Sequence, residues 1–463
     1  MVESEAAETG LDSYAGFLAE YPKTGPGTRG GDMLRRYWHP LCLSNDLKDL
    51  PYPVRMLGED LVAFRTAEGK VGLLGARCPH RCASLEYGQI VAKGIQCSYH
   101  GWTFDRTGHC TAMPLEPANT PLKAEVKQPW YPTHEWGGFV WCYMGLDKQN
   151  PPPLPKLDLL ARTDGKVTLQ RGIILPGPEG TPVVVEPVDI RNYNYLAFLE
   201  NFVDMGHIYA LHMILPPNLP EDLRPYCDLS VDTDWHRTQH RAIETDWGIK
   251  AVVVHNTANP EVKFVNTFSV AMPIYYRFSG LGARQADFCD DRRESGGVIR
   301  IIDDKHFELI RVSLVREGNY RGRAGSFYGK SAPGTPQTMA MRGALPPKPY
   351  DRRKYPAWEG NIVLEDLVIQ ESQGPIPPRE SEHLATSDAG VALLRRVWRQ
   401  SIANVANGLP PKTIVTDNAG VFDVDTFKGF AKASDIELGP RNMPSSRDGR
   451  GLIRDDAGRL VFA

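Results

Sequence analysis

Two short segments, each combining a cysteine with a histidine, restrict the fold of this chain more than any other feature. Cys78 is followed by His80, and Cys97 is followed by His100. Two thiolates and two imidazoles arranged as two short pairs can hold a metal centre. We expect two loops at one end of a small β-domain to bind this centre between them. Turn residues lie beside both pairs: Pro79, Gly88, Gly94 and Gly101.

Three interpretations of these pairs compete. In a [2Fe–2S] cluster of mixed ligation, the thiolates hold one iron, the histidines hold the other, and the reduction potential rises. A structural zinc site favours two neighbouring cysteines followed by two neighbouring histidines. Each pair here instead mixes one Cys with one His. Buried thiols with unrelated histidines are the third interpretation, and the paired spacing favours the cluster.

A second group of polar residues extends from Asn201 through Asp204 and His207 to His212. Two imidazoles five residues apart do not face each other on a straight helix, so a bend near Gly206 would be needed. One carboxylate from elsewhere would complete a 2-His-1-carboxylate set, which leaves positions on Fe(II) open for O2 and substrate. Histidines that fill the core are the simpler interpretation. The zinc-protease signature H-E-x-x-H is absent.

Composition changes along the chain and suggests its domains. Short apolar runs broken by Gly, Pro and Asp between residues 37 and 144 predict an all-β domain. The stiff segment Asn150-Pro-Pro-Pro-Leu-Pro155 marks a boundary. We expect an N-terminal extension at 1–36 (a short helix, then a loop over Thr24–Gly31), the β-domain at 37–150 and a larger domain at 151–463. In the last, helices are expected at 192–213, 362–371 and 388–406, and strands at 251–257, 264–272 and 306–315.

The overall composition excludes several classes of protein. A net charge of −3 argues against a nucleic-acid binder. No apolar run is long enough for a membrane span, and the N-terminus lacks the pattern of a signal peptide, which favours the cytoplasm. Eight cysteines in such a context indicate metal binding or burial more than disulfides. Gly25–Gly30 matches GxGxxG, but no apolar strand precedes it, so no dinucleotide fold is expected.

The two groups together resemble the motifs of one family. Cys78-Pro-His80-Arg-Cys-Ala-Ser84 with Cys97-Ser-Tyr-His100-Gly-Trp102 resembles the cluster motif of the Rieske oxygenases, and Glu200 to His212 resembles their mononuclear-iron motif. The most similar subgroup is the phthalate 4,5-dioxygenase type with related aryl-ether O-demethylases. Tyr99 stands where respiratory Rieske proteins have a second disulfide cysteine, so the cluster is of the oxygenase type. Supporting segments are residues 24–27, 36–40, 365–375 and 382–388.

The resemblance implies an α+β protein: an all-β Rieske domain followed by a larger catalytic domain resembling a helix-grip sheet. It implies that Asp204 connects a cluster histidine of a neighbouring subunit to an iron histidine, and that Asn201 lines the iron pocket. Glu365 is the alternative to Asp366 as the acidic iron ligand. The implied ligands are Cys78 and Cys97 on one cluster iron, His80 and His100 on the other, and His207, His212 and Asp366 on the catalytic Fe(II).

The implied reaction is oxygenation of an aromatic acid with O2, by ring dihydroxylation or O-demethylation. Because the chain has no flavin or nicotinamide fingerprint, electrons should come from NAD(P)H through a separate flavin and iron–sulfur reductase. A homotrimer or homohexamer is expected, without nucleic-acid or membrane partners. The alternatives are an electron-transfer protein without its own oxygenase activity and a zinc-structured binding protein.

The sequence provides several candidate residues for contacts with the substrate. Arg277 and Arg311 are candidates to bind a substrate carboxylate, and solvent-facing strand charges are the simpler interpretation. Phe268, Met272 and Tyr275 could line the pocket, although filling the core is the simpler role.

Overall fold

The computed structural model describes residues 13–176, 182–186, 188–207, 211, 239–256, 260–279, 293–315, 362–414, 420–422, 424, 426, 428–434, 452–454 and 460–462. The chain forms two compact units. The first comprises Met1–Lys156, Ile299–Phe307 and Arg399–Gly420, and the second comprises Leu157–Val298, Glu308–Trp398 and Val421–Ala463. Among the described residues, no helix combines the length and apolar character that a membrane crossing requires.

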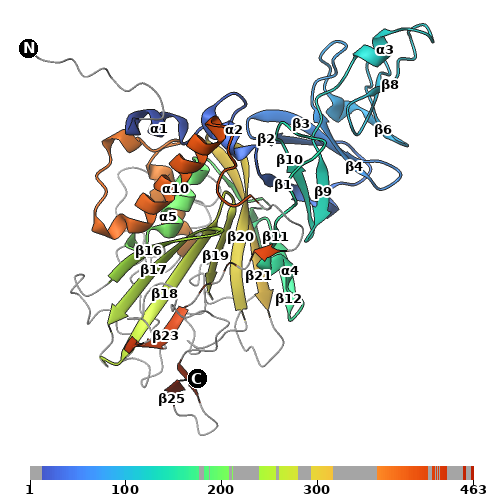
Figure 1. The fold of residues 1–463 in the computed structure, drawn as a ribbon. Coiled ribbons are helices and arrows are strands. Elements are labelled where there is room, and N and C mark those ends of the chain that lie inside the picture. Colours follow the sequence, from blue (N-terminus) through green and yellow to red (C-terminus); the bar gives the residue numbers. More distant parts are fainter. Residues whose placement is uncertain are drawn as a thin grey trace, which may run out of the picture. The chain divides into compact units, whose positions relative to one another are not determined.

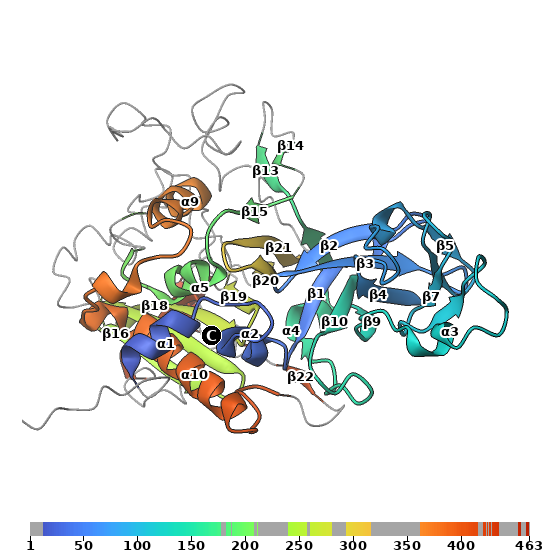
Figure 2. The ribbon, with the colours of Figure 1, turned by 90° about the horizontal axis from the view of Figure 1, so that it is seen from above.

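Small antiparallel sheets build the first unit, as the short apolar runs predict (Figure 2). Their strands are three to seven residues long and end in turns. The first sheet has the order β1 (Trp38–Leu43), β10 (Phe139–Tyr143), β9 (Thr133–Trp136); the second β2 (Tyr52–Met56), β3 (Glu59–Arg65), β4 (Val71–Gly75); the third β5 (Gln89–Val91), β6 (Gly94–Gln96), β7 (Thr103–Asp105), β8 (Cys110–Ala112). A short helix, α3 (Leu122–Glu125), follows β8.

A buried core joins the second and third sheets. Apolar side chains of β3 and β4 meet those of β6 and β7 there, and Cys78 and Cys97 belong to the same cluster. The two cysteines that the sequence singles out therefore lie at the wall of the core, beside the loops that leave β4 and β6. The largest members of the cluster are Phe64, Trp102 and Phe104.

The N-terminal segment contains two helices, α1 (Tyr14–Glu20) and α2 (Arg29–Leu34). The loop predicted over Thr24–Gly31 is therefore wrong for its last residues, because Arg29 to Gly31 belong to α2. Thr28 caps α2, since its hydroxyl accepts a hydrogen bond from the Gly31 amide at 3.1 Å. A Cβ atom at Gly31 would lie 2.0 Å from the carbonyl oxygen of Gly25, so this glycine is required by close backbone contact.

A long antiparallel sheet dominates the second unit and confirms the predicted α+β class (Figure 1). Its strand order is β12-β21-β20-β19-β18-β17-β16, with β15 also pairing with β21 and β23 with β18. The strands expected at 251–257, 264–272 and 306–315 are present. The bounds are β12 (Lys166–Gln170), β15 (Ile190–Arg191), β16 (Gln239–Thr245), β17 (Gly248–Asn256), β18 (Val262–Ala271), β19 (Tyr275–Ser279), β20 (Arg293–Asp303), β21 (His306–Val315) and β23 (Lys428–Lys432).

Three helices position the residues of interest in this unit: α5 (Tyr195–Val203), α9 (Ile362–Ser372) and α10 (Ala389–Ala406). α9 and α10 confirm the helices predicted at 362–371 and 388–406. α5 packs against β18, and its Tyr195 ring lies 6.3 Å from that of Trp398 on α10. The single helix expected at 192–213 is wrong in length, because α5 ends at Val203 with Asp204 as its C-cap.

Candidate active site

Two loops with the same hydrogen-bond pattern carry the first group of candidate ligands. One follows β4 and starts at Cys78, and the other follows β6 and starts at Cys97. In both, the cysteine amide donates to the carbonyl five residues later, and the cysteine carbonyl accepts from the amide four residues later. The bonds are Cys78 N to Ala83 O (2.9 Å), Cys82 N to Cys78 O (2.9 Å), Cys97 N to Trp102 O (2.8 Å) and Gly101 N to Cys97 O (3.0 Å).

Each loop closes through a residue in the left-handed backbone region. Gly101 has φ +74°, and Cys82 occupies the equivalent position in the other loop with φ +57°. A Cβ atom at Gly101 would lie 2.6 Å from Cγ of Pro114. The second loop therefore needs glycine for both conformation and space, whereas the first loop holds a cysteine in a conformation that side chains disfavour.

The thiols of Cys78 and Cys97 point into the core, with 1% and 3% exposure. Burial raises the pKa of Cys78 to about 11, and the Cys97 side chain is near enough to hydrogen-bond with it. A thiolate at this position therefore needs a cation beside it. The pair suits soft ligation of one metal.

The imidazoles of the two loops lie side by side. The ring centroids of His80 and His100 are 4.4 Å apart. Trp102 stacks on His80 at 4.4 Å and 7° between planes, and Tyr99 lies 3.8 Å from the ring of His100. The Nδ1 atom of His80 is buried and has no hydrogen-bond partner among the described residues. Because buried ring nitrogens are normally satisfied, this orphaned atom, two neighbouring thiols and a second imidazole fit a mixed-ligand [2Fe–2S] cluster.

The second group begins where α5 ends. The carboxylate of Asp204 accepts a hydrogen bond from the Gly206 amide at 2.8 Å, which turns the chain out of the helix. The bend predicted near Gly206 is therefore present. His207 Nδ1 donates to the backbone carbonyl of Asp204 at 2.5 Å. That bond selects the tautomer whose lone pair is on Nε2, the form in which His207 can bind a metal through this atom.

The carboxylate of Asp366, on α9, approaches this imidazole. Its Oδ1 atom lies 3.5 Å from His207 Nε2 and accepts a hydrogen bond from Asn201 Nδ2 at 3.3 Å. Two donors bound at right angles, each about 2.1 Å from one metal, lie about 3 Å apart. The structure thus brings together three of the predicted residues, Asn201, His207 and Asp366, in an arrangement that fits two ligands of one ion.

His212 and the side chain of Glu365 lie outside the described residues. Within the described part of the chain, no group of three His, Cys, Asp or Glu side chains could hold a single metal ion. His207 and Asp366 provide two such side chains.

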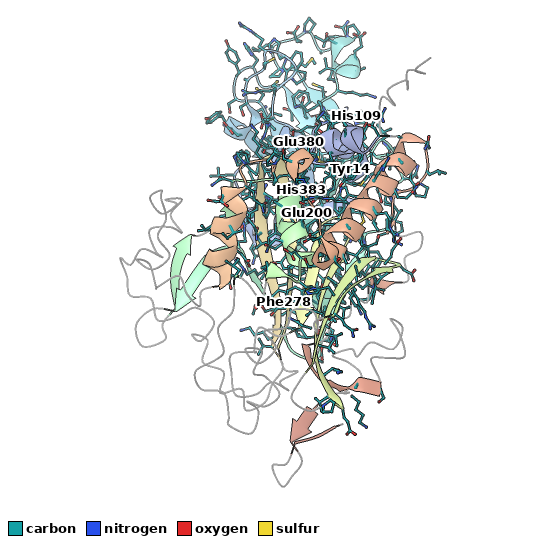
Figure 3. The ribbon with its side chains drawn as sticks, turned by 90° about the vertical axis from the view of Figure 1, so that its left-hand side faces the viewer. Tyr14, His109, Glu200, Phe278, Glu380 and His383 are labelled. Atoms are coloured by element: carbon teal, nitrogen blue, oxygen red, sulfur yellow. The ribbon has the colours of Figure 1, made fainter. Side chains whose placement is uncertain are left out.

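A buried ion cluster that sequence reasoning missed fixes α5. The carboxylate of Glu200 accepts from Nη2 of Arg379 at 2.8 Å and from Nε of Arg395 at 2.7 Å. Burial alone would raise the pKa of Glu200, but the two guanidinium groups keep it below its usual range. Figure 3 shows Glu200 on α5 near Glu380 and His383 of the segment that contains Arg379. Arg379 and Arg395 are 179 and 195 positions from Glu200 in sequence, so no local pattern indicated this cluster.

Aromatic side chains surround the sheet-facing side of α5. Phe202, directly after Asn201, has its ring 5.0 Å from Phe268 and 4.9 Å from Tyr276. Phe198, one helical turn earlier, lies 5.1 Å from Tyr276. We call the set the aromatic face: Phe198, Phe202, Phe268, Tyr276 and Phe278. All but Tyr276 are only half-buried, and the four-residue spacing of the two α5 phenylalanines was the available signal.

The arginines suggested for substrate binding are engaged elsewhere. Arg277 is fully buried and pairs with Asp158 at 3.3 Å and with Glu294 at 2.5 Å, so the solvent-facing interpretation is wrong and its guanidinium group is already engaged. Arg311 pairs with the buried carboxylate of Asp189 at 2.7 Å. The core role is confirmed for Tyr275, which is 1% exposed, and for Met272, which is 4% exposed, whereas Phe268 belongs to the aromatic face.

Comparison with known proteins identifies the family. Residues 37–129 match the model of the Rieske [2Fe–2S] domain. The oxygenase subunit of tert-butanol monooxygenase / tert-amyl alcohol desaturase from Aquincola tertiaricarbonis is 31% identical over 98% of this chain and 89% of that protein. The phenoxybenzoate dioxygenase subunit alpha from Ectopseudomonas oleovorans is 31% identical over 83% and 84%, respectively. Dicamba monooxygenase bound to dicamba shares the fold with a TM-score of 0.52, 17% identity, and coverage of 81% of this chain and 99% of that chain.

The matches extend through both units and are with oxygenase subunits, which favours an enzyme over a protein that only transfers electrons. The two loops with their thiols and imidazoles fit the cluster of such an enzyme, and the convergence of His207 with Asp366 fits its iron. The chain therefore belongs to the Rieske non-haem iron oxygenases, as an oxygenase component that uses a [2Fe–2S] Rieske cluster and a mononuclear iron.

Proposed function

We propose that the Rieske domain occupies residues 37–150 and the catalytic domain residues 151–463, after an extension at 1–36. In this assignment the two cysteines, Cys78 and Cys97, hold one cluster iron, and the two histidines, His80 and His100, hold the other. The catalytic iron is bound by His207, His212 and Asp366. The approach of Asp366 Oδ1 to His207 Nε2 at 3.5 Å is the observation that supports this best.

The side chains around the iron then have separate tasks. When bound, the iron supplies O2 activation, driven by electrons from the cluster. The carbonyl of Asp204 holds the Nδ1 proton of His207, so that the ring presents Nε2. Asn201 donates to Asp366 and orients its carboxylate. The carboxylate of Asp204 is proposed to receive a cluster histidine of a neighbouring subunit, in a homotrimer or a pair of stacked trimers.

The substrate is proposed to be an aromatic acid, oxygenated by ring dihydroxylation or by O-demethylation. The aromatic face supports this, because aromatic rings bind well to edge-to-face and stacked partners. The name of the phenoxybenzoate dioxygenase relative supports it too. Ring dihydroxylation and O-demethylation use the same two metal centres, so the proposed ligands serve either reaction.

A second candidate is hydroxylation of a tertiary alcohol. It is favoured by the 31% identity with the tert-butanol monooxygenase subunit, which extends over 98% of this chain. Arg277 and Arg311 are both paired with carboxylates of the chain itself, so the two cations first suggested for an acid are already engaged. A neutral, compact substrate would need no such cation.

Electrons are proposed to come from NAD(P)H through a separate flavin and iron–sulfur reductase, in the cytoplasm. The test couples the purified protein to such a reductase under 18O2 with phthalate, phenoxybenzoate, methoxybenzoate and tert-butanol in turn. A cis-diol carrying two labelled oxygens indicates ring dihydroxylation, formaldehyde with a phenol indicates O-demethylation, and a singly labelled diol from tert-butanol indicates the second candidate. O2 uptake no greater than that of His207→Ala with every substrate would refute the oxygenase site.

A further inference from the structure

The helix that carries Asp366 is held by few buried side chains. Among the described side chains of α9, only Leu367 and Gln370 are buried, with 7% and 1% exposure. Gln370 follows Asp366 by four residues and therefore lies on the same side of the helix, one turn further on. The anchor of this face of α9 is thus a polar side chain, and its orientation depends on a hydrogen-bond partner.

That partner is the phenol of Tyr193. Its Oη donates to Oε1 of Gln370 at 2.5 Å, and the two residues are 177 positions apart in sequence. Tyr193 is fully buried. Burial raises the pKa of Tyr193, so its hydroxyl remains the donor at neutral pH. The bond is shielded from water, and its loss would leave the amide oxygen of Gln370 without its donor.

The same region joins α9 to the start of α5 through the backbone as well. Asn194 is the N-cap of α5, and its side chain accepts from the Leu196 amide at 3.1 Å. The amide of Asn194 donates to the carbonyl of Pro375 at 2.8 Å, just after α9. Consecutive residues, Tyr193 and Asn194, therefore connect the beginning of α5 with the C-terminal end of α9, and the two helices are in contact (Figure 2).

We infer that Tyr193 and Gln370 are a positioning pair, which holds the carboxylate of Asp366 at the distance from His207 that iron binding requires. The inference rests on the proposed iron site and assigns a role to two residues outside it. The pair acts on Asp366 through the placement of α9, because Gln370 lies one helical turn from Asp366 on that helix. Outer partners that orient metal ligands typically contribute 10–100-fold to metal affinity.

The test measures Fe(II) affinity of the cluster-loaded protein rather than turnover. Iron is removed from the mononuclear site with a chelator, and Fe(II) is then titrated back under anaerobic conditions in competition with a chromophoric chelator. Tyr193→Phe removes only the hydroxyl, and Gln370→Met removes the acceptor at similar volume. Each variant should bind Fe(II) roughly 10–100-fold more weakly, and the double variant should lose little beyond either single variant, since both remove the same bond.

Tyr275→Phe is the matched control. Its buried hydroxyl donates to Asp158 at 2.6 Å, in the same unit but on β19. It should leave Fe(II) affinity unchanged, and the visible spectrum and sulfide content should show an intact cluster in all variants. Wild-type affinity in both Tyr193→Phe and Gln370→Met would overturn the inference, as would an equal loss in Tyr275→Phe. Failure of the wild type itself to bind iron beyond the cluster would instead contradict the proposed function.

Discussion

Two consecutive arginines on α10 provide a sharp test of how the second unit is stabilised. Arg395 is 4% exposed and donates to Glu200 at 2.7 Å and to Glu382 at 2.6 Å. The Arg396 side chain is 70% exposed and pairs with Glu244 at 3.1 Å. Replacing each arginine by methionine keeps a long apolar stem and a similar helix propensity. The two variants therefore differ mainly in whether the lost charge was buried.

The magnitudes follow from the two environments. Arg395→Met removes two charge-assisted hydrogen bonds, each contributing about 1.5–3 kcal/mol. Arg379 still neutralises Glu200 in part, so the expected cost is about 3–5 kcal/mol, as for other broken buried pairs. Arg396→Met should cost about 0–1 kcal/mol, because water replaces an exposed pair. At about 2–4 °C per kcal/mol, the thermal midpoint should fall by roughly 10 °C for Arg395→Met and by less than about 4 °C for Arg396→Met.

The assay is thermal unfolding followed by tryptophan fluorescence at low and at high salt. The Arg395→Met shift should persist at high salt, since a buried pair is poorly screened, and the small Arg396→Met shift should shrink. Equal shifts for the two variants would refute the reasoning. So would a midpoint for Arg395→Met within 1–2 °C of wild type.

Three further predictions concern the metal sites and one buried histidine. His207→Ala and Asp366→Asn should each lose the mononuclear iron yet keep two irons and two sulfides per chain, whereas joint loss of both centres would contradict separate sites. Gly101→Ala should reduce the cluster content of the purified protein, because the new Cβ would lie 2.6 Å from Pro114 in a left-handed turn. The control variant Cys82→Gly should retain the cluster. Equal cluster content in the two variants would contradict this account of the loop geometry. Burial lowers the pKa of His39 from 6.5 to about 4. The unfolded chain then binds the proton more readily, so the free energy of unfolding should fall by about 3 kcal/mol as the pH drops from 6.5 to 4. Urea titrations at several pH values should show that the free energy of unfolding falls less steeply with decreasing pH for His39→Gln than for the wild type. Parallel pH dependences of the two proteins would disprove this account.

Local sequence patterns were sufficient to predict the cluster loops and several helices and strands. The two hydrogen bonds of Cys78 with Cys82 and Ala83 connect residues at most five positions apart, so the motif itself contains the information for this turn. The helices α9 and α10 and the strand β21 were predicted for the same reason, since their periodicity is local. The end of α5 at Asp204 could also be predicted from the sequence, because an Asp side chain competes for nearby backbone amides.

Contacts between distant segments were decided only by the tertiary structure. Asn201 and Asp366 are 165 residues apart, and their meeting depends on how α9 packs beside α5. The sequence does not distinguish buried Arg395 from exposed Arg396, or show that Arg277 is neutralised by Asp158 and Glu294 inside the unit. Burial is set by which face of an element meets its neighbours, and that depends on the whole fold. For this chain, the sequence by itself determined the kind of chemistry, and the packing of α5, α9 and the long sheet decided which side chains orient it.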